Sequence, residues 1–151
     1  LEFSSSTNTV INRTNVKYLD TLCLVVLDKV LKLDSICVFI LNTPVKFSKT
    51  DLSVVGYIQK DPFKNHTYFL YVDKNELRSK IDFISHEMVH LNQLEHGRLK
   101  DYSSFGFNVF EGVTIDLRTP YFKRAYEIEA ITLSIAISDS VRKIIYKKFI
   151  W

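Results

Sequence analysis

Apolar residues recur at steps of three and four along the first part of the chain, from Asn15 to Leu33. This spacing places them on one face of a helix, and neighbouring leucines widen that face. We therefore expect an N-terminal helix that is largely surrounded by the core. The residues on its apolar face are Val16, Leu19, Cys23, Val26, Val30 and Leu33.

Three segments rich in β-branched and aromatic residues come next, and each reads as a strand. They are Ser35 to Leu41, Leu52 to Gln59 and Thr67 to Val72. An Asn-Thr-Pro turn closes the first, and a loop containing Pro and Asn separates the other two. Together they predict a small mixed β-sheet.

A second amphipathic helix is predicted to begin after Asp73 or Asn75, because either side chain can accept hydrogen bonds from the first free N–H groups of a helix. Gly97 marks its end. We expect its apolar stripe to pack on the sheet. The stripe consists of Ile81, Ile84, Met88 and Leu91.

The remaining segments have weaker patterns. The aromatic stretch 102–115 carries two glycines and reads as a loop, with a short strand or hairpin left open within it. A last helix follows Pro120 and runs toward the C-terminus. Residues 1–14 are polar and without a period, which predicts a mobile arm or an edge segment. The order of elements indicates a single α+β domain over 15–151, preceded by that polar arm.

The composition agrees with one globular domain. The chain has 151 residues, of which 46% are hydrophobic and 25% charged. A domain of this size buries roughly two-thirds of the surface that its unfolded chain exposes. The net charge is +3 and the basic residues are scattered, so we expect no nucleic-acid partner.

Membrane insertion and disulfide chemistry are not expected either. The longest apolar runs, about six residues, fall far short of the roughly 20 that span a bilayer. We expect a soluble protein, with no signal peptide and no transmembrane segment in this chain. Cys23 and Cys37 lie inside apolar runs without a C-x-x-C spacing, so we interpret them as small core residues.

An H-E-x-x-H motif lies inside the second predicted helix, formed by His86, Glu87 and His90. Residues four apart project about 40° apart on one helical face, with Cβ atoms roughly 6 Å from each other. Two imidazoles so placed can bind one tetrahedral Zn²⁺. Glu87 is turned about 100° from His86, beside the metal, where its carboxylate can take a proton from metal-bound water.

A catalytic zinc site needs a third protein ligand and leaves its fourth position open to water. His96 is turned about 120° away from His90 on the same helix, so it is an unsuitable ligand. Glu127 and Glu129 begin the last helix, and only one of them can face the metal. We favour Glu127, because small or slim residues share its face and let the two helices approach, and keep Glu129 as the alternative.

The sequence HEMVH at 86–90, followed 37 residues later by EIEA at 127–130, resembles the gluzincin metallopeptidases, whose third ligand is a glutamate on a later helix. The chain is most similar to the minigluzincins in size and order of elements, and its E-x-E-A string also resembles the peptidases related to the phage-repressor-cleaving family. The resemblance spans roughly 54–137. One departure is Ile131, where many members carry an Asp or Asn that partners a zinc-bound histidine.

This resemblance implies a zinc metallopeptidase that acts on a peptide or protein substrate. His86, His90 and Glu127 would hold Zn²⁺, and Glu87 would accept a proton from water and pass it to the leaving amine. In that family an edge strand before the active-site helix pairs with an extended substrate. The segment 52–59 is the corresponding strand here, and its Gly56 would allow a close backbone approach or form a bulge.

The developing oxyanion would also need a hydrogen-bond donor. Tyr121, Arg124 and Tyr126 lie just before Glu127 and are the candidates. Two other hypotheses stay open. The chain could be a zincin-like structural or interaction module, for example a phage or viral particle component, that binds zinc without catalysis, or the motif could be accidental. An intact Glu87 argues against a purely structural site, which has no use for a base.

Overall fold

The computed structural model describes residues 7–43 and 55–150. Within them the chain forms an α+β fold with two small sheets, which confirms the predicted fold class. In chain order the elements are β1 (Thr9–Asn12), α1 (Leu19–Val25) with a π-helical turn (Val26–Val30), β2 (Cys37–Asn42), β3 (Gly56–Lys60), β4 (Thr67–Val72), α2 (Lys80–Glu95), β5 (Leu99–Tyr102), a 3₁₀ turn (Ser103–Phe105), β6 (Phe107–Phe110), β7 (Val113–Asp116), a 3₁₀ turn (Tyr121–Lys123) and α3 (Ala125–Ile150).

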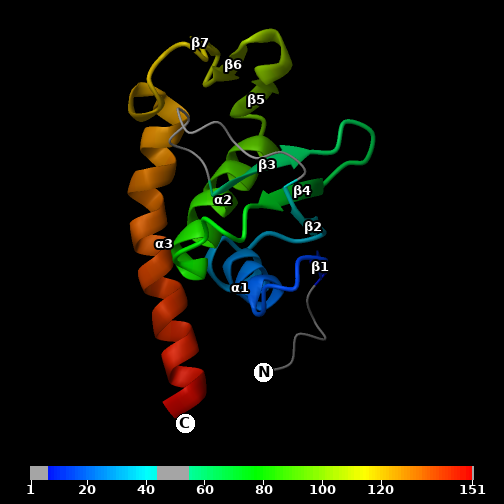
Figure 1. Ribbon diagram of the computed structural model, residues 1–151, viewed down its shortest axis with the longest axis vertical. Coiled ribbons are helices and arrows are strands. Elements are labelled where there is room, and N and C mark those ends of the chain that lie inside the picture. Colours follow the sequence, from blue (N-terminus) through cyan, green and yellow to red (C-terminus); the bar gives the residue numbers. More distant parts are fainter. Residues whose placement is uncertain (1–6, 44–54, 151) are drawn as a thin grey trace.

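The layers follow one another from α3 through α2 to the larger sheet (Figure 1). That sheet has the order β1-β2-β4-β3, with β1, β2 and β4 parallel and β3 antiparallel to β4. The sheet is therefore mixed, as predicted, and β3 forms one of its edges. Because successive side chains on a strand alternate between faces, every second residue of β2 and β4 points to the helices. These side chains are fully buried: Val38, Ile40, Tyr68, Leu70 and Val72.

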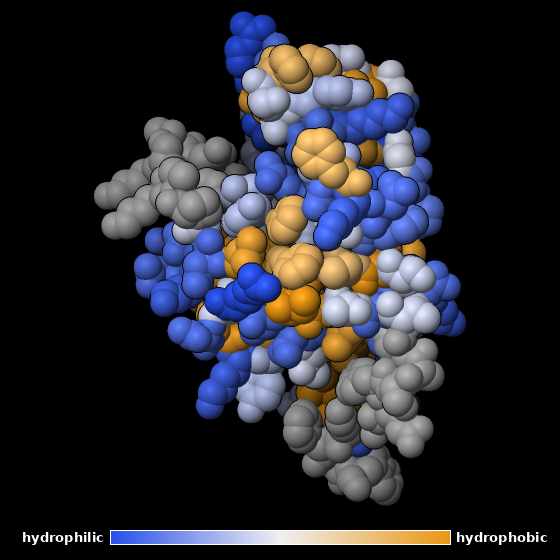
Figure 2. Space-filling model, turned by 90° about the vertical axis from the view of Figure 1, so that its right-hand side faces the viewer, coloured by the Kyte–Doolittle hydropathy of each residue, from blue (hydrophilic) through white to orange (hydrophobic). Residues whose placement is uncertain are grey.

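The opposite face of this sheet carries a second row of apolar side chains. Phe39 stacks on Phe69 with ring centroids 5.8 Å apart, and Tyr57 stacks on Tyr71 at 4.8 Å. These residues are half-buried. Figure 2 views the molecule from this side and shows hydrophobic residues gathered in the middle of the face, with hydrophilic ones around them. Because both faces of this sheet carry apolar side chains, its strands are nearly continuous hydrophobic runs in the sequence.

Helix α2 carries the predicted apolar stripe into the core. Ile84, Met88 and Leu91 are fully buried, and the helix ends just before Gly97, whose φ of 71° suits a glycine. The predicted start was wrong. Ser79 caps the helix, with its hydroxyl accepting from the backbone N–H of Asp82.

Asp73, the predicted cap, instead closes a turn in the loop between β4 and α2. Its carboxylate accepts from the N–H of Asn75, and its carbonyl accepts from Glu76. This local hydrogen bonding competes with helix initiation, which is why a residue favourable for capping did not start the helix.

The first helix is shorter than its periodicity suggested. Asn15 and Tyr18 have φ values of 44° and 73°, so the chain is not helical before Leu19, and Lys32, with φ of 53°, follows its end. The apolar residues outside α1, Val16 among them, still pack against the core. The spacing of apolar residues from 15 to 33 therefore predicted which residues are buried, but it overestimated the length of the helix.

Two segments expected to be irregular form strands. Within the polar segment 1–14, Thr9–Asn12 pairs in parallel with β2, so the edge-segment interpretation holds there, and residues 1–6 lie outside the described residues. The aromatic stretch 102–115 belongs to an antiparallel sheet of order β5-β6-β7, more regular than the predicted loop. Gly106 and Gly112, with φ of 89° and 78°, allow its turns.

The other predicted elements agree with the structure. Strand β4 has the predicted bounds, and β2 differs from its prediction by one or two residues at each end. Of the strand predicted over 52–59, residues 52–54 lie outside the described residues, and β3 begins at Gly56. Cys23 and Cys37 are free, the first buried and the second half-buried. Within residues 7–43 and 55–150, no helix combines the length and the apolarity that crossing a membrane requires.

Gly56 forms no bulge, since it pairs with Val72 in the regular register of β3 and β4. A Cβ at this position would collide with the carbonyl oxygen of Tyr71 and would lie 2.9 Å from the ring of Phe83. We expect Gly56→Ala to lower the free energy of unfolding by about 2–3 kcal/mol, because backbone cannot yield to the added methyl group. Thermal unfolding should show this loss, with Lys60→Ala on the same strand as a control within about 0.5 kcal/mol of wild type. An unchanged melting temperature for Gly56→Ala would contradict the packing argument.

Candidate metal centre

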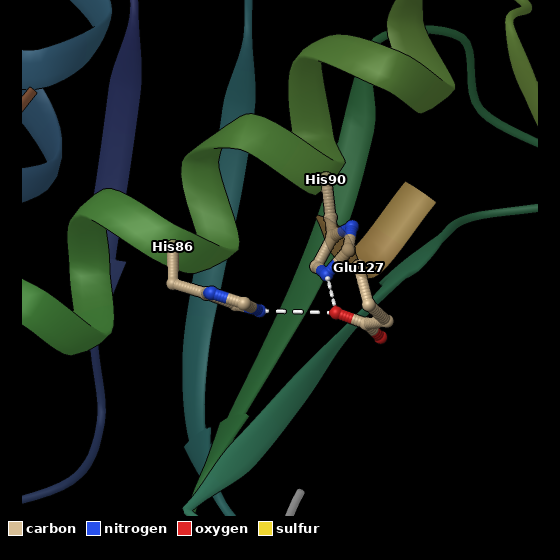
Figure 3. Close-up of side chains that lie close together, drawn as sticks. All are labelled: His86, His90 and Glu127. Carbon is tan, nitrogen blue, oxygen red and sulfur yellow. Dashed lines mark hydrogen bonds and ion pairs between the residues drawn. The ribbon is translucent and has the colours of Figure 1, made fainter. Parts of the chain in front are cut away.

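Three side chains from two helices converge in the structure, as Figure 3 shows. His86 and His90 project from the same face of α2, and Glu127 reaches them from the first turn of α3. One ligand atom from each lies within 4.8 Å of the other two. Glu127 Oε1 is 3.1 Å from His86 Nε2 and 2.7 Å from His90 Nε2. These three residues therefore form a group that can hold a metal ion.

The close packing of α3 along α2 brings this group together. Tyr126 and Ala130, which precede and follow Glu127 on α3, are both buried in the core. The predicted reason for choosing Glu127, a face of small or slim residues, holds at Ala130, which is 0% exposed. Glu127 itself is 8% exposed, so its carboxylate is presented inside the protein rather than to solvent.

Glu129, the alternative ligand, turns to other partners. Both of its carboxylate oxygens accept from Arg98, at 2.8 and 2.7 Å, and Oε1 also accepts from Gln93. His96 lies at the exposed C-terminal end of α2, with its Nδ1 donating to the carbonyl of Asn92. Neither residue belongs to the converging group, in agreement with the predicted choice of Glu127.

The charges of the group attract one another. Burial opposes ionisation of Glu127, but hydrogen bonds from His86 and His90 outweigh it and hold its pKa at about 2. Burial likewise opposes the charged form of His90, but the hydrogen bond to Glu127 and the negative charge of that carboxylate raise its pKa to about 9. Without a metal, the site thus holds an ionised carboxylate beside a protonated imidazole.

Binding of a metal ion through Nε2 of His90 should therefore release a proton, because Nε2 can bind a metal only after it has lost its hydrogen. Between pH 7 and 9 we expect the affinity for a divalent metal ion to rise by up to about tenfold per pH unit. Glu127 adds nothing to this dependence, since it stays ionised down to a pKa of about 2. Calorimetric titration in two buffers with different ionisation enthalpies measures the released proton. An affinity that stays constant from pH 7 to 9 would contradict this prediction.

Glu87 lies next to the group without belonging to it. Its side chain lines the same pocket as His90 and Glu127, a pocket of about 260 Å³ that opens beside β3. It is 7% exposed, and burial raises the pKa of its carboxyl to about 7. A carboxyl group with this pKa can both accept and return a proton near neutral pH.

The three candidate donors occupy different places around the pocket. The Tyr121 hydroxyl is 3.2 Å from His86 Nε2, and burial raises the pKa of Tyr121, so this hydroxyl keeps its proton. Arg124 lines the pocket but donates to the carbonyls of Leu117 and Thr119. The buried Tyr126 hydroxyl accepts from Asn108. Of the three, Tyr121 is the one whose polar atom contacts the His-His-Glu group.

Sequence reasoning missed Gln93, which is fully buried at the contact between α2 and α3. Its Oε1 accepts from Nδ1 of His90 at 2.9 Å. This contact gives His90 a buried hydrogen-bond partner from its own helix. The available signal was its position three residues after His90, which places both side chains on one side of the helix.

Comparisons of the chain with models of known protein families, with curated proteins and with solved structures find no match.

Proposed function

We propose that this chain is a zinc-dependent metallopeptidase of the gluzincin type. The observation that carries the proposal is the convergence of His86, His90 and Glu127 at a pocket that His90, Glu127 and Glu87 line. Two imidazole nitrogens and one carboxylate oxygen are a donor set that catalytic zinc uses, with the fourth position left to water. The side chains present therefore fit zinc.

When bound, Zn²⁺ would acidify a water molecule and polarise the carbonyl of the bond to be cleaved. Glu87 accepts the proton of that water and returns it to the leaving amine, which its pKa of about 7 makes feasible in both directions. The Tyr121 hydroxyl is the favoured donor to the developing oxyanion, because it keeps its proton and lies on the His86 side of the group.

The position of strand β3 is suited to binding an extended peptide as an additional strand of the sheet. Among the described residues β3 lies at the edge of the larger sheet, and Gly56, Tyr57 and Gln59 line the pocket that contains Glu87. A peptide can add to the edge of a sheet as a further strand. We propose that the peptide or protein substrate lies along β3, with the bond to be cleaved beside Glu87.

Protein purified without added zinc is expected to contain about one zinc per chain and to hydrolyse an unstructured protein such as denatured casein. A chelator should abolish this hydrolysis, and added zinc should restore it. Elemental analysis and a gel-based cleavage assay are the measurements. Protein without zinc in elemental analysis that takes up none on titration would make the motif accidental. Zinc-loaded protein that cleaves nothing across a broad peptide library would favour the alternative of a structural or interaction module.

A further inference from the structure

The buried amide of Gln93 connects the proposed metal site to α3. Its Nε2 donates to the backbone carbonyl of Tyr126 and to Glu129 Oε1, both at 3.1 Å. Its Oε1 lies 2.9 Å from Nδ1 of His90. The side chain is 0% exposed, so these neighbours, and not water, decide how the amide is oriented.

The orientation of the amide follows from the chemistry of its neighbours. A backbone carbonyl and an ionised carboxylate can only accept hydrogen bonds, so the NH₂ group of Gln93 must face Tyr126 and Glu129. The amide oxygen is then turned to His90. Because an oxygen without hydrogen can only accept, His90 must carry a hydrogen on Nδ1, which leaves Nε2 as the atom that faces Glu127 and can bind a metal.

Glu129 is itself held in place from outside the pocket. Arg98 donates to both of its carboxylate oxygens, and Arg98 also pairs with Glu111 at the β6–β7 turn. Hydrogen bonds thus run without interruption from the small sheet through Arg98 and Glu129 to Gln93 and His90. Glu127 and Glu129 leave α3 in different directions, one to the histidines and one to this chain of hydrogen bonds.

We propose that Gln93, oriented by Glu129, is the positioning residue that holds His90 with its proton on Nδ1 and its Nε2 toward the metal. The inference rests on the proposed metal site. A neutral amide here takes the place that a carboxylate commonly takes beside zinc-bound histidines. The two glutamates of the EIEA string then have separate tasks: Glu127 binds the metal, and Glu129 fixes the partner of a metal ligand.

The first test measures zinc affinity of the full chain by competition with a chromophoric chelator. Gln93→Met keeps a side chain of similar length without hydrogen bonds, and we expect it to weaken zinc binding about 10–100-fold. Glu129→Ala should weaken it as well, since Gln93 loses one of the two acceptors that orient its amide. Asn92→Met, a similar change one position earlier on α2, serves as the control with wild-type affinity. Wild-type affinity in Gln93→Met would overturn the proposal.

The second test needs no variant and no activity. In ¹⁵N-labelled wild-type protein loaded with zinc, the histidine ¹H–¹⁵N correlations should show the His90 hydrogen on Nδ1, protected from exchange by Gln93. A hydrogen on Nε2, with Nδ1 bound to the metal, would overturn the proposal. If the protein binds no zinc, the proposed function fails, but the metal-free protein still reports whether the Nδ1 hydrogen is protected in wild type and exposed in Gln93→Met.

Discussion

Glu87→Gln is expected to lower the rate of peptide hydrolysis by roughly 10²–10⁴-fold while leaving zinc binding intact. The amide has the size of the carboxyl group but cannot accept the proton of the attacking water. Glu87 is 93% buried from solvent, as its 7% exposure shows, so no external buffer molecule can readily replace it. The zinc content should stay near one per chain, because Glu87 is not part of the His-His-Glu group.

The measurement is the initial rate on an unstructured protein or an internally quenched peptide, with zinc determined on the same samples. Glu76→Gln is the matched control, since it makes the same chemical change at an exposed position in the loop before α2. Hydrolysis by Glu87→Gln at the wild-type rate would assign the base to another residue. Loss of zinc together with activity would mean that Glu87 supports the metal site directly.

The local part of the fold could be predicted because its signals are local. The β-branched and aromatic content of Thr67–Val72 predicted both its type and its bounds, and the stripe Ile84, Met88 and Leu91 faced the core as expected. Starts and ends were predicted less well. Asp73 and Ser79 are both favourable caps, and the choice between them depends on the turn that the chain makes after β4.

The small sheet was anticipated only as a short strand or hairpin, although each strand pairs with the next one along the chain, because its strands are short. Each of β5, β6 and β7 has four residues. Several of them are exposed, so the alternation of apolar and polar residues that announces a strand is weak. The glycines at its turns were read as signs of a loop. A positive φ at a glycine is equally suited to a tight turn between strands, and here it serves that purpose.

The part of the site that lies on one helix could be predicted from helical geometry. The relative placement of His86 and His90 follows from residues per turn alone. The choice of Glu127 needed one further assumption, that α3 crosses α2 with its slim face inward, and the structure agrees. Contacts that depend on how closely α2 and α3 approach each other could not be predicted from the sequence. Gln93 reaches the backbone of α3 and Tyr121 reaches His86 only because the two helices meet at a particular depth.

Glu127→Gln is expected to weaken zinc binding by roughly 10²–10³-fold. Structural zinc sites with four ligands bind with about 10–16 kcal/mol, so an equal share for one ligand is roughly 2.5–4 kcal/mol. The amide oxygen that remains carries no charge and is a poor substitute for a carboxylate. In the metal-free protein the same change removes the negative charge that holds the proton on His90, whose raised pKa of about 9 should fall toward its ordinary value.

The change in unfolding temperature on adding zinc gives a readout that is independent of hydrolysis. A ligand that binds the folded state alone stabilises it by about 4 kcal/mol when its concentration is 1,000 times its dissociation constant. At a zinc concentration chosen to meet this condition for wild type, Glu127→Gln should keep only about 0.4–1.4 kcal/mol of that stabilisation. Glu76→Gln should respond to zinc as wild type does. An equal zinc response in Glu127→Gln and wild type would remove Glu127 from the ligands, and the proposed coordination by α2 and α3 would fail with it.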